Sequence, residues 1–280
     1  MAMNYQLTCE GIKIFDKRQF SPRHILDCGQ VFCYDKRGDN YISYPQNQFA
    51  EIIEFEKYYL IKTKNVDFFV DYFDLSTNYE KIKCELGSFQ MLKEPILFGY
   101  GIRILNQDLF ETLLSFIISA NNNIKRIKVI LNNIRRALGE KIGDNVYSLP
   151  TYEVLKAQDE DFYKKAGAGY RAKYLIKMLH QITPQLLEEW RKLDTAALRT
   201  KLVSIAGVGP KVADCILLFG YHRGDSFPVD TWMAKMYNMY FEPIENRNIM
   251  RDNLVKQFGK NSGYAQQYLF YYIKENNQKS

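Results

Sequence analysis

Residues 202–214 read Leu-Val-Ser-Ile-Ala-Gly-Val-Gly-Pro-Lys-Val-Ala-Asp, and this segment decides the fold. Its two glycines accept backbone angles that other residues avoid, which allows a tight turn between two helices. Pro210 suits the first turn of the second helix, where a backbone donor has no helical acceptor. The pattern therefore predicts a helix–hairpin–helix, in which uncovered amides at Gly207, Val208 and Gly209 could bind a phosphate oxygen. A purely structural helix–turn–helix corner is the alternative.

Lys211 lies in the first turn of the second helix. Positive charge is unfavourable at a helix N-terminus, so we expect a lowered pKa for Lys211 and a neutral, nucleophilic amine. Such an amine can attack an electrophilic carbon and form an imine, although a lysine here could also simply contact phosphate. Cys215 follows four residues later on the same helical face. Most free cysteines are merely buried, which is the alternative for Cys215.

Asp230 stands in the segment Phe227-Pro-Val-Asp-Thr-Trp232, directly before a helical pattern over 232–240. Taken locally, it is a good helix N-cap. Because it follows a candidate nucleophile by 19 residues, its carboxylate could return to the same pocket, stabilise a developing cation and move protons. The two roles are compatible.

The chain changes from β-type to helical patterning near residue 105. The β-type segments are 6–15, 31–34, 41–44, 49–55 and 58–63, with a hairpin turn expected at 35–39. The expected helices are 66–85, 108–119, 124–138, 151–157, 170–179, 232–240 and 263–275, together with the two around the hairpin. The predicted fold class is α+β: an N-terminal twisted antiparallel β-sheet domain (1–105), followed by a mostly α-helical helix–hairpin–helix domain (106–280).

Composition narrows the class of protein. The chain has 280 residues, 46% of them hydrophobic and 25% charged, which excludes wholesale disorder. Its net charge of +6 permits an anionic partner without requiring one. There is no apolar run of membrane-spanning length, about 20 residues, and no basic and apolar secretory pattern at the N-terminus. We therefore expect a cytoplasmic protein, associated with the nucleoid if it is bacterial.

The five cysteines form no CxxC pair and are odd in number, so a disulfide framework is not expected. His24, Cys28 and Cys33 lack a fourth ligand at a recognisable spacing, and no cysteine follows Cys215. The sequence therefore implies neither a metal site nor an organic cofactor.

Several segments carry polar side chains in the order found in a known family. They are Asp27-Cys-Gly-Gln-Val-Phe32, Ser119-Ala-Asn-Asn-Asn-Ile-Lys-Arg126, Gly167-Ala-Gly-Tyr-Arg-Ala-Lys-Tyr174, Lys211-Val-Ala-Asp-Cys215 and Tyr264-Ala-Gln-Gln-Tyr-Leu-Phe270. Spread over nearly the whole chain, they resemble the helix–hairpin–helix DNA glycosylases of base-excision repair, and most closely the 8-oxoguanine DNA glycosylase/AP lyases of the Ogg type.

The resemblance implies a bifunctional enzyme. Lys211 would attack C1′ of the damaged nucleoside, expel the base and leave a Schiff base to the sugar. Asp230 would stabilise the oxocarbenium-like sugar and assist proton transfer. The imine then permits β-elimination of the 3′ phosphate. The damaged base must first leave the helical stack.

The resemblance also implies a pocket for the flipped base. Phe270 and Cys215 would sandwich it, and Gln266 would bond its Watson–Crick face. The main-chain carbonyl of Gly29 would detect the N7–H that distinguishes 8-oxoguanine from guanine, and Phe219 would line the floor. Seen locally, these residues could instead belong to an amphipathic helix, a turn and a packed core.

Four further residues would handle the opposite strand, namely Asn121, Arg126, Tyr170 and Arg171. Tyr170 would wedge between bases, Asn121 would fill the vacated space, and the arginines would bond the acceptor edge of the orphaned cytosine. A helix cap and solvated arginines are the local alternatives. The chain departs from animal-type members at Trp232, where they have a histidine that contacts phosphate.

Two other functions remain open from the sequence. One is a glycosylase for another damaged purine, such as an alkylated base. The other is a non-catalytic helix–hairpin–helix protein that only grips DNA. Lys211 argues against the first, because monofunctional relatives lack the hairpin lysine. Lys211, Asp230, Gln266 and Phe270 together argue against the second. The expected partner is duplex DNA carrying 8-oxoguanine, preferably opposite cytosine, and the expected state is a monomer.

Overall fold

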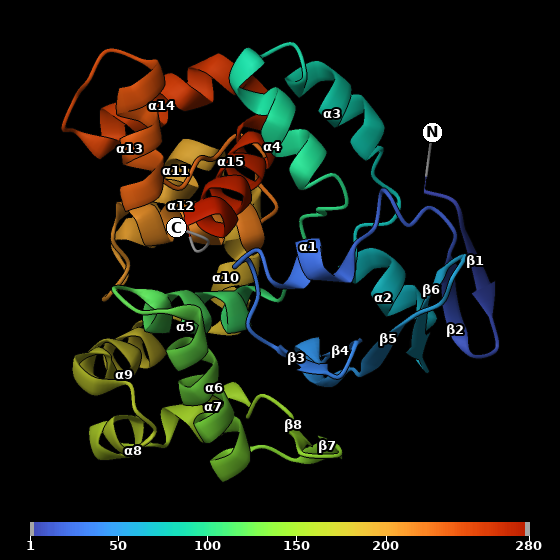
Figure 1. The fold of residues 1–280 in the computed structure, drawn as a ribbon. Helices are drawn as coiled ribbons and strands as arrows, with labels where there is room; N and C mark the ends of the chain where they lie inside the picture. The colour runs from blue at the N-terminus through green and yellow to red at the C-terminus, as the bar shows by residue number, and fades with distance from the viewer. Residues whose placement is uncertain (1–2, 278–280) are drawn as a thin grey trace.

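An antiparallel sheet of six strands forms the N-terminal part of the computed structural model, which describes residues 3–277 (Figure 1). The strands are β1 (Tyr5–Thr8), β2 (Gly11–Ile14), β3 (Tyr34–Arg37), β4 (Asn40–Ser43), β5 (Ala50–Glu54) and β6 (Tyr59–Thr63). Their order in the sheet is β1-β2-β6-β5-β4-β3. Most of the remaining chain is helical, so the predicted α+β fold class is confirmed.

Two hairpins differ from the sequence prediction. The single segment expected over 6–15 is two strands, because Cys9 and Glu10 form a turn between them. Gly11 (φ +141°) begins β2 so close to β6 that a Cβ would lie 2.0 Å from the Ile61 oxygen. The strand expected over 31–34 instead spans Tyr34–Arg37. Gly38 (φ +59°) and Asp39 form a two-residue turn. Because the turn is this short, the polar residues 35–37 belong to the edge strand β3 and pair with β4.

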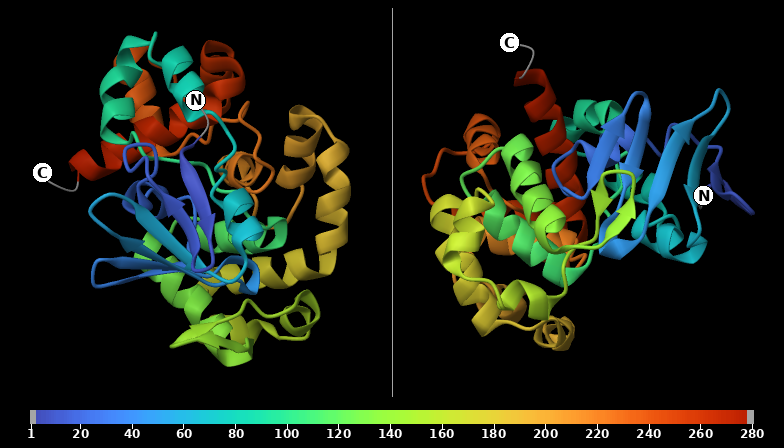
Figure 2. Two further views of the ribbon diagram at one scale, coloured as in Figure 1. Left: turned by 90° about the vertical axis from the view of Figure 1, so that its right-hand side faces the viewer. Right: turned by 90° about the horizontal axis from the view of Figure 1, so that it is seen from below.

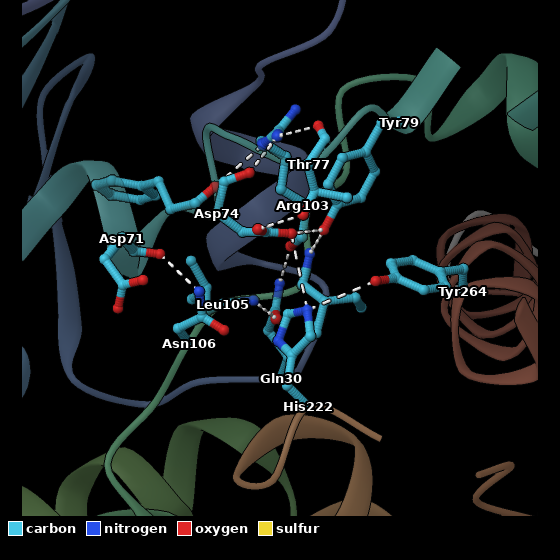
Figure 3. Close-up of polar contacts among 12 residues, drawn as sticks. Gln30, Asp71, Asp74, Thr77, Tyr79, Arg103, Leu105, Asn106, His222 and Tyr264 are labelled. Atoms are coloured by element: carbon cyan, nitrogen blue, oxygen red, sulfur yellow. Dashed lines mark hydrogen bonds and ion pairs between the residues drawn. The ribbon is translucent and has the colours of Figure 1, made fainter. Parts of the chain in front are cut away.

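The helix expected over 66–85 is also interrupted. It consists of α2 (Val66–Tyr72) and α3 (Tyr79–Leu86), and Asp74 between them adopts φ +50°. Its carboxylate accepts hydrogen bonds from the hydroxyls of Thr77 (2.6 Å) and Tyr79 (2.8 Å). The fully buried Arg103 side chain donates to main-chain carbonyls of this break (Figure 3). Local polar bonding has thus replaced helical continuity.

The helices expected over 108–119 and 124–138 are α5 (Leu109–Ser119) and α6 (Ile124–Leu138). The other helices are α1 (Pro22–Leu26), α4 (Lys93–Phe98), α7 (Tyr152–Lys156), α8 (Glu160–Lys165), α9 (Ala172–Gln181), α10 (Pro184–Glu189), α11 (Thr195–Val203), α12 (Pro210–Phe219), α13 (Thr231–Tyr240), α14 (Arg247–Phe258) and α15 (Ser262–Asn277). A small hairpin, β7 (Lys141–Gly143) and β8 (Val146–Tyr147), lies within the helical part. The sequence analysis missed this hairpin and the helices α1, α4, α8, α10 and α14.

Three hydrophobic cores stabilise the chain. One lies under the sheet, one surrounds α5 and α12, and one joins α3 and α4 to α13, α14 and α15. The third core brings residues 79–98 against the C-terminal helices, so packing crosses the proposed boundary at residue 105. In Figure 2 the sheet lies to one side of the helical body. None of the described helices is long and apolar enough to cross a membrane.

Candidate active site

The hairpin between α11 and α12 forms as the sequence predicts. Gly207 has φ +86°, and a Cβ there would lie 2.8 Å from Cβ of Tyr174. The first hydrogen bond of α12 runs from the amide of Ala213 to the carbonyl of Gly209, at 2.9 Å. Gly209 is exposed, whereas Val208 is buried. The amide of Val208 donates to the carbonyl of Ile205 (3.0 Å), so it is not free as the sequence analysis expected. Within residues 3–277 the amides of Gly207 and Gly209 donate no hydrogen bond, and such uncovered donors at a helix start attract anions.

Directly after the hairpin, the chain builds a small pocket from three helices, α5, α12 and α15, and two loop segments, 28–29 and 228–230. All seven residues predicted for catalysis or base binding line it: Gly29, Lys211, Cys215, Phe219, Asp230, Gln266 and Phe270. Lys211, Cys215 and Phe219 come from α12, while Gln266 and Phe270 come from α15. Segments more than 200 residues apart in the sequence therefore meet at one cavity, as the sequence analysis expected.

The electrostatics of Lys211 differ from the prediction. Burial alone lowers the pKa of Lys211, but the hydrogen-bonded Cys215 sulfur and the Asp230 carboxylate outweigh it and raise the pKa above its usual value. The predicted lowering is wrong for the free protein, because the argument from the helix end ignored these neighbours. Burial likewise raises the pKa of the Cys215 thiol, although Lys211 opposes that shift. At neutral pH the pocket holds an ammonium and a thiol.

Asp230 is the N-cap of α13, as predicted. Its carboxylate oxygen Oδ1 accepts a hydrogen bond from the amide of Met233 at 2.9 Å. The cap fixes the orientation of the carboxylate, while its charge acts on Lys211. One residue thus holds the helix start and contributes negative charge to the pocket.

The pocket floor is aromatic. Phe219 stacks on Phe116 of α5, with ring centroids 5.6 Å apart and an interplanar angle of 13°. The Lys211 ammonium lies 5.7 Å from the centroid of Phe116. Sequence reasoning missed Phe116, because it belongs to the apolar face of α5 and carries no signal beyond core packing. It also missed Cys28, Pro228 and Gln267, which line the same cavity.

The pocket is small. Its volume is about 40 Å³, roughly enough for a single water molecule. A Cβ at Gly29 (φ +89°) would lie 3.4 Å from the ring of Phe270, so the ring faces the glycine across the pocket. A planar aromatic base is larger than the present space, so the pocket must widen to admit it.

Gln266 presents an unused acceptor. Its side chain is 5% exposed, and within residues 3–277 its buried Oε1 atom accepts no hydrogen bond. Buried polar atoms are almost always paired, so an unpaired one in a pocket wall points to a hydrogen-bonding guest.

The residues predicted for the opposite strand gather at the turn after α5. Asn121 is exposed, with φ +50°, and Tyr170 is 51% exposed. Arg171 is only 3% exposed and donates to the carbonyls of Ala120 (2.8 and 2.6 Å) and Asn121 (2.7 Å). In the free protein Arg171 therefore supports the turn, and the alternative of a solvated arginine is wrong for it.

Arg126 is exposed in the first turn of α6. Its amide donates to Oδ1 of Asn123 (2.9 Å), so the helix cap considered for this asparagine run is present and leaves the guanidinium free to reach outward. Trp232 of α13 is 38% exposed, and the Lys235 ammonium lies 5.1 Å from its ring centroid. Among the residues described, no three His, Cys, Asp or Glu side chains come together as metal ligands would.

Comparison with known proteins agrees with this geometry. A sequence profile of the N-terminal domain of 8-oxoguanine DNA glycosylase matches residues 13–113. The fold is similar to that of Clostridium acetobutylicum 8-oxoguanine glycosylase/lyase, solved in complex with double-stranded DNA containing cytosine opposite 8-oxoguanine. The two chains are 37% identical with a TM-score of 0.91, over 99% of this chain and 100% of that one.

Two curated relatives match a shorter region. The N-glycosylase/DNA lyase of Saccharomyces cerevisiae is 36% identical over 54% of this chain and 45% of its own length. The N-glycosylase/DNA lyase OGG1 of Arabidopsis thaliana is 33% identical over 61% of this chain and 51% of its own. The chain thus spans about half the length of these curated relatives.

The hairpin offers a matched pair of glycine substitutions. Gly207→Ala should lower the free energy of unfolding by about 1–3 kcal/mol, because it forces a side chain into the left-handed region and against Tyr174. Gly209→Ala should change it by less than about 0.5 kcal/mol, since Gly209 has negative φ and nothing within 4 Å of the Cβ position. Urea denaturation measures both. Equal effects of the two substitutions would contradict the assigned hairpin geometry.

Proposed function

Since the chain belongs to the 8-oxoguanine DNA glycosylase family, we propose that it excises 8-oxoguanine from duplex DNA and then nicks the strand as an AP lyase. The observation that carries the proposal is the meeting of Lys211, Asp230 and Gln266 at one pocket behind the hairpin. The related Clostridium enzyme, bound to DNA with cytosine opposite 8-oxoguanine, supports the same substrate.

The chemistry begins with proton loss from Lys211, because its raised pKa keeps it an ammonium in the free protein. The neutral amine attacks C1′, and the bond from C1′ to the base breaks with its electron pair leaving on the base, which is then protonated. Asp230 stabilises the positive charge that develops on the sugar and relays protons. Opening of the sugar ring gives the imine between Lys211 and C1′.

The lyase step follows from the imine. Its positive nitrogen acidifies the hydrogens on C2′, and loss of one of them expels the 3′ phosphate by β-elimination. Water then hydrolyses the imine and releases Lys211. These steps use side chains of this chain only.

Recognition of the base uses the opposite walls of the pocket. Phe270 and Cys215 would hold the base between them once Phe270 has moved, and the unpaired Oε1 of Gln266 would accept from its Watson–Crick edge. The Gly29 carbonyl would accept from N7–H, which guanine lacks. Phe219 would form the floor.

The strand contacts complete the proposal. The amides of Gly207 and Gly209 would bind a phosphate of the damaged strand, and Val208 between them would hold the turn through its hydrogen bond to Ile205. Tyr170 would wedge between bases, Asn121 would occupy the space of the extruded nucleotide, and Arg126 with Arg171 would bond the orphaned cytosine. Trp232, exposed beside Asp230, would lie near the backbone. We propose that the protein works as a monomer in the cytoplasm, since one pocket serves one duplex.

Borohydride trapping on a duplex with one 8-oxoguanine opposite cytosine tests the function. The parent protein should form a covalent complex, because borohydride reduces the imine to a stable amine. Lys211→Gln should form none and should excise the base roughly 10³-fold more slowly or worse, since it removes the nucleophile. Lys256→Gln, at an exposed lysine of α14, is the control and should trap like the parent.

A parent protein that binds the duplex without excision or trapping would contradict this substrate. Trapping on a duplex with an alkylated purine instead would establish the alternative glycosylase. Binding without chemistry on any lesion would leave a DNA-binding protein.

Preference for cytosine opposite the lesion tests Arg126. The parent should excise 8-oxoguanine faster opposite cytosine than opposite adenine, because guanidinium donors match the acceptor edge of cytosine. Arg126→Ala should reduce the ratio of the two rates by about tenfold, the scale of one specific base contact. Arg136→Ala, at an exposed arginine of the same helix, should leave the ratio unchanged. Equal parental rates opposite the two bases would refute the preference.

Cys215 should set the pH dependence of imine formation. Because Cys215 is a cause of the raised pKa of Lys211, Cys215→Ala should lower that pKa. The neutral amine then forms at lower pH, so the midpoint of the pH profile moves down and trapping near pH 7 becomes faster. The measurement is the trapping rate against pH on a preformed abasic site, which avoids base binding. An unchanged or higher midpoint would contradict the assigned coupling.

A further inference from the structure

The segment Asp27–Gln30, which carries Gly29, has its carbonyl groups held from outside. Three long side chains each donate to one carbonyl: Lys274 to that of Asp27 (2.8 Å), Gln267 to that of Cys28 (3.1 Å) and Gln107 to that of Gln30 (2.8 Å). Within residues 3–277, the carbonyl of Gly29 accepts no hydrogen bond. Its neighbours on both sides are therefore fixed, while this one acceptor is left for a guest.

The side chains that flank Gly29 are fixed as well. The Asp27 carboxylate accepts from the hydroxyls of Tyr34 (2.9 Å) and Tyr41 (2.7 Å) of the sheet. The fully buried Gln30 side chain donates to the carbonyl of Arg103 (2.8 Å) and accepts from the amide of Leu105 (2.9 Å), beside the network drawn in Figure 3. Gly29 therefore lies in a short segment whose two ends, Asp27 and Gln30, are held by side-chain hydrogen bonds.

Two of the donors belong to α15, the helix that also carries Gln266 and Phe270. Gln267 is 1% exposed and Lys274 is largely buried, so neither side chain is an ordinary solvated surface residue. Through them, one helix both presents side chains to the pocket and holds the main chain of the opposite wall.

We propose that Gln267 and Lys274 are positioning residues that aim the Gly29 carbonyl at N7–H and so set the discrimination between 8-oxoguanine and guanine. This inference rests on the proposed function. The two bases present a donor and an acceptor, respectively, to the same carbonyl, which attracts one and repels the other. Both effects depend steeply on distance and angle, so a carbonyl that can tilt discriminates less.

The test compares variants that remove one donor with little change in volume, Gln267→Met and Lys274→Met. Three quantities are measured: the single-turnover rate of 8-oxoguanine excision, the cleavage rate of a preformed abasic site, and the ratio of affinities for 8-oxoguanine and guanine duplexes. Affinities are measured in the Lys211→Gln background to prevent turnover. The abasic site needs the nucleophile and the DNA surface but no base recognition.

We expect each variant to slow excision by about tenfold and to shrink the affinity ratio by about fivefold or more. Cleavage of the abasic site should stay within about twofold of the parent. The matched controls are Gln257→Met and Lys256→Met, at exposed positions of α14, and both should behave as the parent in all three measurements.

Three results would overturn the inference or its premise. If the parent excises 8-oxoguanine and both variants keep its affinity ratio, the positioning role is wrong. If excision, abasic cleavage and melting temperature all fall together, the two residues are only structural. If the parent itself does not excise 8-oxoguanine, the proposed function fails first. If Gln267→Met does not fold, the result for Lys274→Met decides whether the positioning role holds, because the Lys274 side chain is partly exposed and its replacement disturbs the core less.

Discussion

The site depends on a buried ion pair behind the hairpin. Asp214 of α12 is 2% exposed, and its carboxylate accepts from Nε (2.8 Å) and Nη2 (3.1 Å) of Arg199 on α11. Arg251 of α14 approaches the same carboxylate to 3.5 Å. A two-point contact fixes the relative orientation of the two hairpin helices, and an unpaired carboxylate at this depth would be strongly unfavourable. Since Lys211 and Cys215 flank Asp214 on α12, the ion pair also orients Lys211, the proposed nucleophile.

The neighbours of Lys211, and not its burial, determine the charge state of this proposed nucleophile. A lysine at an isolated helix N-terminus is expected to lose its proton easily, because the helix dipole disfavours positive charge. In the folded chain Cys215 and Asp230 raise the pKa of Lys211 against the effect of burial. In the free protein the side chain of Lys211 is therefore a protonated ammonium group. In the proposed reaction the base that enters must alter this balance before Lys211 can attack C1′, so base binding and activation of the amine would act on the same charges.

The residues that could be predicted from the sequence are those whose chemistry is unusual for their place. Lys211 beside a glycine turn and Asp230 before a helix stand out locally, and a family resemblance supplied Gly29, Gln266 and Phe270. Phe116 could not be found, since an aromatic residue on the inner face of a helix is ordinary core. Gln267 and Lys274 were missed because their partners are main-chain carbonyls more than 200 residues away. The break at Asp74 was missed because its bonds compete with the helix only in the folded context.

The walls of the pocket differ in how firmly they are held. The Gly29 wall is tied through the carbonyls on both sides of the glycine, and Asp230 is fixed by its cap to Met233. Lys211 is tied to Cys215 by a hydrogen bond, on a helix held by Asp214. Phe270 has only apolar packing, and no hydrogen bond directs its ring. Phe270 is therefore the part of the wall that we expect to move when a base enters the present 40 Å³. A base that displaces the Phe270 ring would then meet the Gly29 carbonyl, whose neighbouring carbonyls are held by hydrogen bonds. In this arrangement the mobile ring allows a base to enter, and the fixed carbonyl distinguishes one base from another.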